Sequence, residues 1–227
     1  GPFTGLGGNR RIQSFSLSLA QLLSPLSLVS VTINPIRSDG YLGHPYNPVI
    51  TATGALIEER LPNRKTSLAV SGKLVQGWQA GDRLGSVHLE ARHYRDDWRL
   101  ISNTVDVQAY QYLSDATWIR LRARGYRQGQ AAFVQGAYLG NETYRTSDIR
   151  FSSFYSLMLG VKVASSFPDA WAESGWLPDR WDIGYDHGFR NTRGESGRVE
   201  PVYRYQLFSP DQIYQQGTVM AGLGFDL

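Results

Sequence analysis

Six charged residues recur at alternate positions in the middle of the chain, a spacing that could build a binding surface. Two-residue spacing puts side chains on the same face of a β-strand. One interpretation is a basic stripe that selects anions or positions a plug inside a pore. The other is a charge network that fills a narrow barrel lumen through cross-strand pairs. The residues are Glu90, Arg92, Asp106, Arg120, Arg122 and Arg124.

The residue types give little indication of an enzyme. None of the four histidines pairs with a serine and an acid at a recognisable spacing, and a nucleophilic enzyme needs such a positioned base. His93 with Asp96 and Asp97 can be interpreted as a small metal or acid/base group. We expect instead a tight turn, followed by Trp98 at a membrane interface. The chain has no cysteine, which excludes thiolate metal sites. We predict no enzyme activity, and no catalytic, cofactor or metal site.

The charged residues belong to residues 86–126, which alternate apolar and polar side chains through three segments. Turns at Asp96-Asp97 and Ser114-Asp115 separate the segments, so the pattern predicts three consecutive antiparallel strands. Pairing about these turns puts Glu90 opposite Asp106, and Asp106 opposite Arg124. The same register puts Arg92 opposite Thr104, and Gln108 opposite both His88 and Arg122. The apolar face holds Val87, Leu89, Ala91, Val105, Val107, Ala109, Ile119, Leu121 and Ala123.

The same period of two predicts about nine strands in one domain, residues 1–227, with no linker. Asp182 and Asp186, on the eighth strand, are expected to balance the arginine stripe. The remaining strands are expected at 12–21, 28–34, 65–76, 149–164, 180–190 and 217–227, and long loops at 35–63, 128–147 and 191–216.

Strands of this kind fit either a soluble sandwich or a transmembrane barrel. Strands of ten or more residues are long enough to cross a bilayer. Small residues on the apolar face are tolerated by lipid but would leave a protein core poorly filled. The last strand carries Phe225 and Leu227, an ending that resembles the insertion signal of outer-membrane barrels. We therefore predict an all-β, antiparallel transmembrane β-barrel.

Strand parity adds a further expectation. Bacterial single-chain barrels have an even number of strands with both termini periplasmic. Nine strands would leave the first residue on the extracellular side if Leu227 is periplasmic. We therefore expect a larger, even-stranded barrel, whose N-terminal strands are missing from this chain or supplied by another one.

Several segments resemble an uncharacterised family of bacterial outer-membrane proteins, catalogued as domain of unknown function 3570. HYRDDW (93–98) is the most specific of them. The resemblance implies a β-barrel in the outer membrane of a Gram-negative bacterium, corresponds to the C-terminal part of the family, and brings no activity or catalytic residue. The sequence departs from it in the loop after Asn191. The other segments are LSP (23–25), SDGYLGHPYNPV (38–49), EERLPNRK (58–65), the run up to Tyr126, and SSFYSLMLGVKV (152–163).

Together these features predict a bacterial outer-membrane protein that acts as a pore or as a membrane-embedded scaffold for a partner complex. Its expected partners are outer-membrane lipid, the barrel-insertion machinery, and a protein partner or the missing N-terminal half. A formal net charge of +3 is too small to indicate nucleic acid. Two alternatives remain open: an outer-membrane enzyme with a site at the extracellular rim, and a soluble β-sandwich binding domain.

Overall fold

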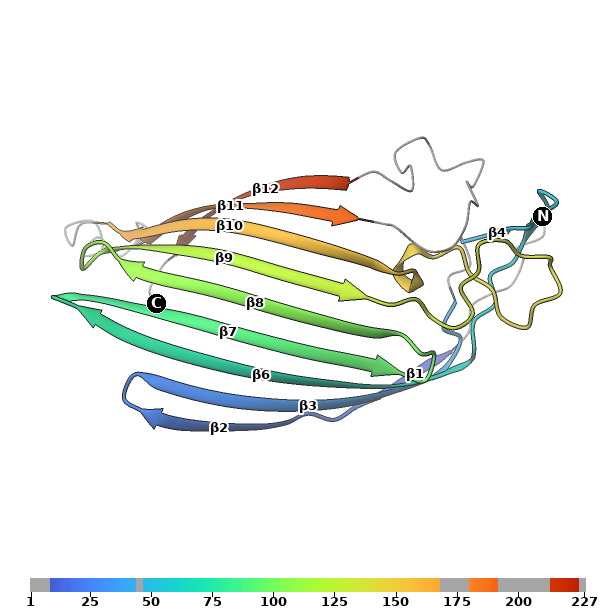
Figure 1. Cartoon of the computed structure of the whole chain (residues 1–227), viewed down its shortest axis with the longest axis horizontal. Helices are drawn as coiled ribbons and strands as arrows, with labels where there is room; N and C mark the ends of the chain where they lie inside the picture. Colours follow the sequence, from blue (N-terminus) through green and yellow to red (C-terminus); the bar gives the residue numbers. More distant parts are fainter. Residues whose placement is uncertain (1–8, 44–46, 168–179, 192–212, 225–227) are drawn as a thin grey trace.

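The computed structural model describes residues 9–43, 47–167, 180–191 and 213–224, which form an all-β, antiparallel structure (Figure 1). One large sheet has the order β1-β3-β6-β7-β8-β9-β10-β11-β12, with β2 also pairing with β3. A separate two-stranded sheet contains β4 and β5. The large sheet contains β1 (Arg10–Ser14), β2 (Leu17–Ser24), β3 (Ser27–Gly40), β6 (Arg64–Ala80), β7 (Arg83–Asp96), β8 (Ile101–Tyr112), β9 (Thr117–Gln128), β10 (Phe154–Ser166), β11 (Arg180–Asn191) and β12 (Ile213–Gly224). The described strands do not close into a barrel.

The ten strands of this sheet occupy nine positions, because β1 and β2 lie end to end along one edge of β3. They share one register, which is interrupted opposite Pro35. Proline has no N–H to donate, so the ladder loses one hydrogen bond there. The Asn34 side-chain amide replaces it and donates to the Phe15 carbonyl at 3.1 Å. The predicted strand at 12–21 is therefore two strands with a proline-induced break.

Several predicted boundaries differ from the structure. β3 continues to Gly40, six residues beyond the predicted end, because the Asn34 amide compensates for Pro35. Ile149–Phe151 is a 3-10 turn (η1) rather than strand, since Asp148 caps it by accepting a hydrogen bond from the Arg150 amide. β12 begins at Ile213, inside the predicted third loop. Phe225 and Leu227, the predicted insertion signal, lie outside the described residues.

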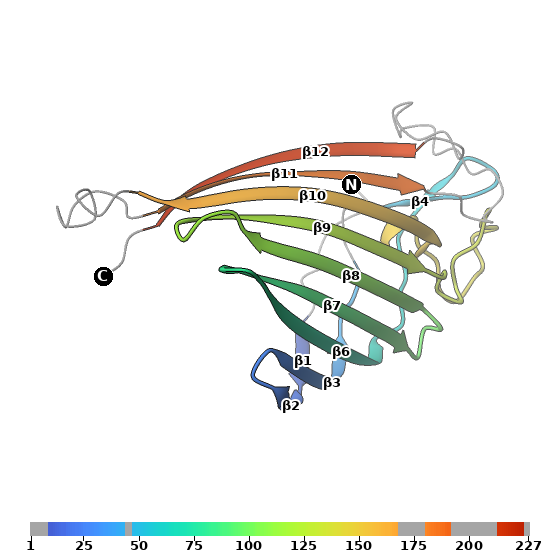
Figure 2. The ribbon, with the colours of Figure 1, turned by 60° about the vertical axis from the view of Figure 1, so that its left-hand side comes forward.

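The sheet is bent into an open trough, with β1–β3 at one rim and β12 at the other (Figure 2). The buried residues of the sheet all lie on its inner, polar face: Ser38, Ser67, Ala69, Ser102, Asp106, Gln128 and Ala164. The outer face is apolar and open: Leu17, Leu19, Val31, Ile33, Leu74, Leu89, Val105, Val107, Leu121, Leu157, Leu159, Val161, Ile183, Tyr185, Val219 and Leu223 are all exposed. This distribution is the reverse of the usual one in water, where a sheet buries its apolar face.

A small apolar core lies at one end of the trough, among the loops. Trp98, Leu100, Ala131 and Phe133 are buried there, and Phe151 packs against them. Trp98 is 5% exposed, so its predicted place at a membrane interface is wrong. The turn after β7 folds it inward, where its indole N–H donates to the Arg64 carbonyl at 2.9 Å.

The two loops at this end are joined to one another. The first contains the short hairpin of β4 (Val49–Ile50) and β5 (Leu56–Ile57). Isolated β-bridges connect Thr51 with Tyr138 and Arg60 with Arg145. Tyr138 and Arg145 belong to the second loop, which lies between β9 and η1. The buried Tyr138 hydroxyl donates to the carbonyls of Phe133 and Thr146 at 3.0 and 2.9 Å. In the described part of the chain, no helix is long and apolar enough to span a membrane.

Candidate functional site

The predicted register of the charged face is confirmed. Glu90 lies opposite Asp106, which lies opposite Arg124 on its other side. Arg92 lies opposite Thr104, and Gln108 lies opposite both His88 and Arg122. Two turns of fixed length are sufficient to set these pairs, because the register of a hairpin follows from its loop. The six predicted residues therefore do share one face of β7, β8 and β9.

The ion pair on this face is diagonal rather than straight across. Arg122, not Arg124, binds Asp106, with Nε at 3.0 Å from Oδ2. The Gln108 amide donates to the other carboxylate oxygen at 2.9 Å, and the Tyr110 hydroxyl donates to Gln108 at 2.8 Å. A diagonal neighbour on the adjacent strand is within reach of a side chain as long as arginine. Asp106 is thereby neutralised inside the trough.

Of the two aspartates of β11, Asp186 attracts the Arg122 guanidinium of the stripe, as expected, whereas Asp182 has another partner. Asp182 pairs with Lys162 of β10 at 2.8 Å, so it balances a lysine rather than the arginine stripe. Asp186 lies over Gly160, where an added Cβ atom would press against its carboxylate. The Asp186 side chain would have to shift if residue 160 carried a Cβ atom. Its buried Oδ1 atom has no hydrogen-bond partner in the described part of the chain.

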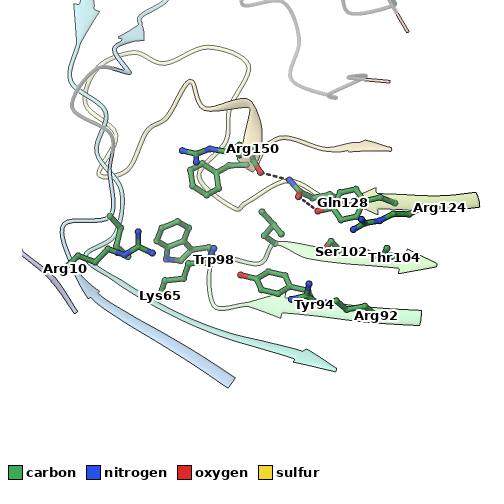
Figure 3. A pocket seen from close by; sticks show the side chains of 14 residues that line it. Arg10, Lys65, Arg92, Tyr94, Trp98, Ser102, Thr104, Arg124, Gln128 and Arg150 are labelled. Carbon is green, nitrogen blue, oxygen red and sulfur yellow. Dashed lines mark hydrogen bonds between the residues drawn. The ribbon is translucent and has the colours of Figure 1, made fainter. Parts of the chain in front are cut away.

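A cavity of about 450 Å³ lies at the loop end of the trough, directly beside the charged face (Figure 3). Ser102, Thr104 and Gln128 supply neutral polar groups to its wall, and Leu42 and Leu100 supply aliphatic ones. Its cationic residues are Arg10, Lys65, Arg92, Arg124 and Arg150, and its aromatic residues are Tyr94, Trp98, Tyr126 and Phe151. Among the described residues, no carboxylate lines it.

Two of these cations have partners. The Lys65 ammonium lies 3.0 Å from the Asp96 carboxylate and 4.8 Å from the centre of the Trp98 ring. The Arg150 guanidinium pairs with Asp148, and this hydrogen bond raises the pKa of Arg150. In contrast, no ion pair within the described residues involves Arg10, Arg92 or Arg124.

Gln128 holds η1, the 3-10 turn beside the cavity, in place. Its amide nitrogen donates to the carbonyls of Arg150 and Ser152 at 2.7 and 2.9 Å, and its oxygen accepts from the Tyr126 hydroxyl at 2.6 Å (Figure 3). These bonds fix η1, and with it Phe151, against the end of β9. Sequence reasoning missed Gln128, although it continues the alternation of Arg120, Arg122 and Arg124 on the inner face.

The group formed by His93, Asp96 and Asp97 is not assembled. His93 lies on the outer face and contacts Asn103, with Nδ1 at 2.8 Å from Oδ1. Asp96 pairs with Lys65 on the inner face, while Asp97 accepts a hydrogen bond from the Thr66 amide at 3.0 Å. These residues form the expected turn. Across the described ranges, no cluster of histidine and carboxylate side chains could hold a metal ion.

A comparison with known protein families tests the family membership that the motifs suggest. Residues 4–177 match the model of the family described as Protein of unknown function (DUF3570). The chain belongs to this family. The match covers β1 to β10, including both loops of the capped end and the whole cavity wall, so the DUF3570 assignment holds for the candidate site. Searches of curated proteins and of solved structures gave no significant match.

Proposed function

We propose that this DUF3570 protein forms part of the wall of a bacterial outer-membrane β-barrel, which acts as a pore or as a membrane-embedded scaffold for a partner complex. The observation that carries the proposal is the reversed distribution of side chains between the two faces. Asp106 is 7% exposed on the inner face, whereas its neighbours Val105 and Val107 are 48% and 37% exposed on the outer face. A barrel that turns its apolar face to lipid and encloses a polar lumen has this distribution.

The dimensions of the strands support a position in a bilayer. β6 has 17 residues, and β7 to β12 have 12 to 14. A tilted strand needs only about 9–11 residues to cross. On the outer face of β8, Asn103 and Gln111 flank the apolar Val105, Val107 and Ala109. Eight residue steps separate these polar positions, about 26 Å along the strand, close to the height of an apolar barrel belt.

The water-soluble sandwich receives less support. A sandwich needs a second sheet over the apolar face. Within the described ranges, the second sheet is the short β4–β5 hairpin, and it belongs to the loops at the end of the trough. An uncovered apolar surface this large is unusual for a soluble monomer.

The two rims imply further strands. In a bilayer every backbone N–H and C=O group must be paired, so an open sheet edge is not tolerated. The edges formed by β1–β2 and by β12 therefore pair, in the proposed barrel, with strands from another part of the same protein or from a second chain. Nine strand positions are also an odd number, whereas single-chain bacterial barrels have even numbers.

Single-cysteine labelling tests the orientation of the two faces. The chain has no cysteine, so Leu159→Cys on the outer face and Met158→Cys on the inner face each give one labelling site. A polarity-sensitive fluorophore should be quenched by spin-labelled acyl chains at position 159 but not at position 158, after reconstitution into liposomes. Equal quenching at both positions, or monodisperse behaviour of the unlabelled protein without detergent, would contradict the proposal.

A further inference from the structure

We infer that the cavity at the loop end of the trough binds a small organic anion. Its carboxylate or phosphate group contacts Arg92 and Arg124, and its apolar body packs against the aromatic wall. This inference goes beyond the proposed function, because a ligand site at the end of the sheet does not require the barrel to conduct ions or recruit a partner. The ligand class follows from the charge, the geometry and the composition of the cavity.

The charge balance indicates an anion. Three inner-face cations lie against a carboxylate: Arg122 against Asp106, Lys162 against Asp182 and, in the cavity itself, Lys65 against Asp96. Arg92 and Arg124 line the cavity without an ion pair in the described part of the chain. Cations gathered in a concave site attract anions and bind oxyanions through charge-assisted hydrogen bonds.

The register places these two arginines on the two strands that flank β8. Arg92 on β7 lies opposite Thr104 on β8, while Arg124 on β9 lies one inner-face position away, opposite Asp106. The strands β7 and β9 are separated by β8 and therefore by about 10 Å. Two arginine side chains can approach a single oxyanion from both sides of β8, and the Thr104 hydroxyl lies between them as a further donor. Figure 3 shows the three side chains along one side of the cavity.

The adjoining acids make no ion pair with these arginines in the described part of the chain, although Asp106 and Arg124 attract each other at longer range. Glu90 and Asp106 lie in a smaller cavity of about 140 Å³, which shares Arg92, Thr104 and Arg124 with the larger one. Asp106 already binds Arg122 and Gln108. Within the described residues, no ion pair connects Glu90 with either arginine. The acids line the smaller cavity and are absent from the lining that the described residues give the larger one.

The aromatic part of the cavity wall suits an apolar body. Tyr94, Trp98 and Phe151 line it, and the rings of Trp98 and Phe151 pack edge to face at 5.5 Å. The Trp98 indole is anchored on the Arg64 carbonyl, and η1 is held by Gln128. Such a rigid wall costs little entropy on binding. A volume of about 450 Å³ is within the range of small-molecule sites.

Calorimetric titration of the full chain in detergent micelles tests the site with two anionic probes, phenyl phosphate and isophthalate. We expect saturable binding of at least one of them, and the preferred probe identifies the site as selective for phosphate or for carboxylate. Benzyl alcohol, a neutral aromatic compound, should not bind. Arg92→Gln and Arg124→Gln should each weaken binding about tenfold or more, which is the loss expected for one charge-assisted contact.

Arg127→Gln is the matched control, because Arg127 lies on the same strand as Arg124 but on the exposed outer face. Its affinity should stay within about twofold of the wild type. Arg92→Lys, which keeps the charge, should retain part of the affinity that Arg92→Gln loses, provided that circular dichroism shows both variants folded. The inference is overturned by the absence of saturable binding of either anion, by equal binding of benzyl alcohol, or by equal losses in the Arg92, Arg124 and Arg127 variants. Because the assay needs no bilayer, its failure leaves the labelling test of the two faces unaffected.

Discussion

The guanidinium of Arg122 binds the carboxylate of Asp106 diagonally across β8 and β9, through Nε and Nη2. The Asp106 side chain is 9% exposed and that of Arg122 is 21% exposed, so the pair is largely removed from solvent. It lies on the inner face next to Arg124, directly opposite Asp106, and Arg92, one row further along; in the described part of the chain neither arginine makes an ion pair. The pair thus marks the boundary between a neutralised part of the trough and a positive one.

Removing one member of this pair should be more harmful than removing both. Arg122→Gln leaves a buried carboxylate without its cation and should lower the free energy of unfolding by about 1–3 kcal/mol. The double variant Asp106→Asn with Arg122→Gln should recover part of this loss. Urea unfolding in detergent micelles, analysed as a double-mutant cycle, measures the coupling. Strictly additive losses would show that the two side chains do not interact.

A charge on the outer face should be costly in a bilayer. Leu159→Arg puts a cation on the proposed lipid-facing surface near the middle of β10, and should cost about 2–4 kcal/mol of unfolding free energy in liposomes. Met158→Arg, the adjacent inner-face control, should cost clearly less because its side chain enters the polar trough. Reversible denaturant titration of the reconstituted protein gives both values. A larger loss at position 158 would contradict the proposed orientation.

The arginines of β9 should control ion selectivity if the full-length protein is a pore. Replacing Arg120, Arg122 and Arg124 together with glutamine should shift the reversal potential toward cation selectivity in a planar bilayer under a salt gradient. Arg127→Gln, on the outer face of the same strand, should leave the reversal potential unchanged. Unchanged selectivity in the triple variant would remove the role proposed for the stripe, leaving its interpretation as a charge network.

Trp98 should stabilise the end of the trough that carries the two loops and the small apolar core. Trp98→Ala removes its contacts with Phe133 and Phe151, and should lower the free energy of unfolding by about 3–5 kcal/mol. Trp98→Phe keeps a ring but loses the hydrogen bond to the Arg64 carbonyl, so its cost should be smaller. Thermal unfolding followed by near-ultraviolet circular dichroism compares the two. Equal stability of the alanine variant and the wild type would show that this core does not support the loops.

The second loop should respond to acid through Glu142. Its carboxylate accepts hydrogen bonds from the amides of Leu139 and Gly140 at 2.6 and 2.9 Å, and the bond from Leu139 is the main reason that its pKa is lowered from 4.5. A lowered folded-state pKa means that the stabilisation is complete above about pH 4.5 and is lost as the pH falls through the lowered value. The amide proton shifts of Leu139 and Gly140 should therefore move together below pH 4.5. Glu142→Gln should abolish this titration.

The strand pattern was predictable because its cause is local. Alternation assigns each side chain to one face, and two short turns set the register that puts Glu90, Asp106 and Arg124 in one row. Errors arose where a single side chain alters the backbone: Asn34 substitutes for the missing donor of Pro35, and Asp148 caps a 3-10 turn. Such individual hydrogen bonds leave no trace in the periodicity of the sequence.

By itself, therefore, the sequence determined the all-β class, the nine strand positions and the separation of charged from apolar residues. The tertiary structure decided which charges are neutralised and where a cavity forms. Arg122 rather than Arg124 binds Asp106, and Gln128 fixes η1 beside the cavity through the carbonyls of Arg150 and Ser152. These outcomes depend on side-chain reach and on contacts between distant loops, such as Glu59 with Thr146. Strand periodicity contains no information about either, because it records only which face a residue occupies.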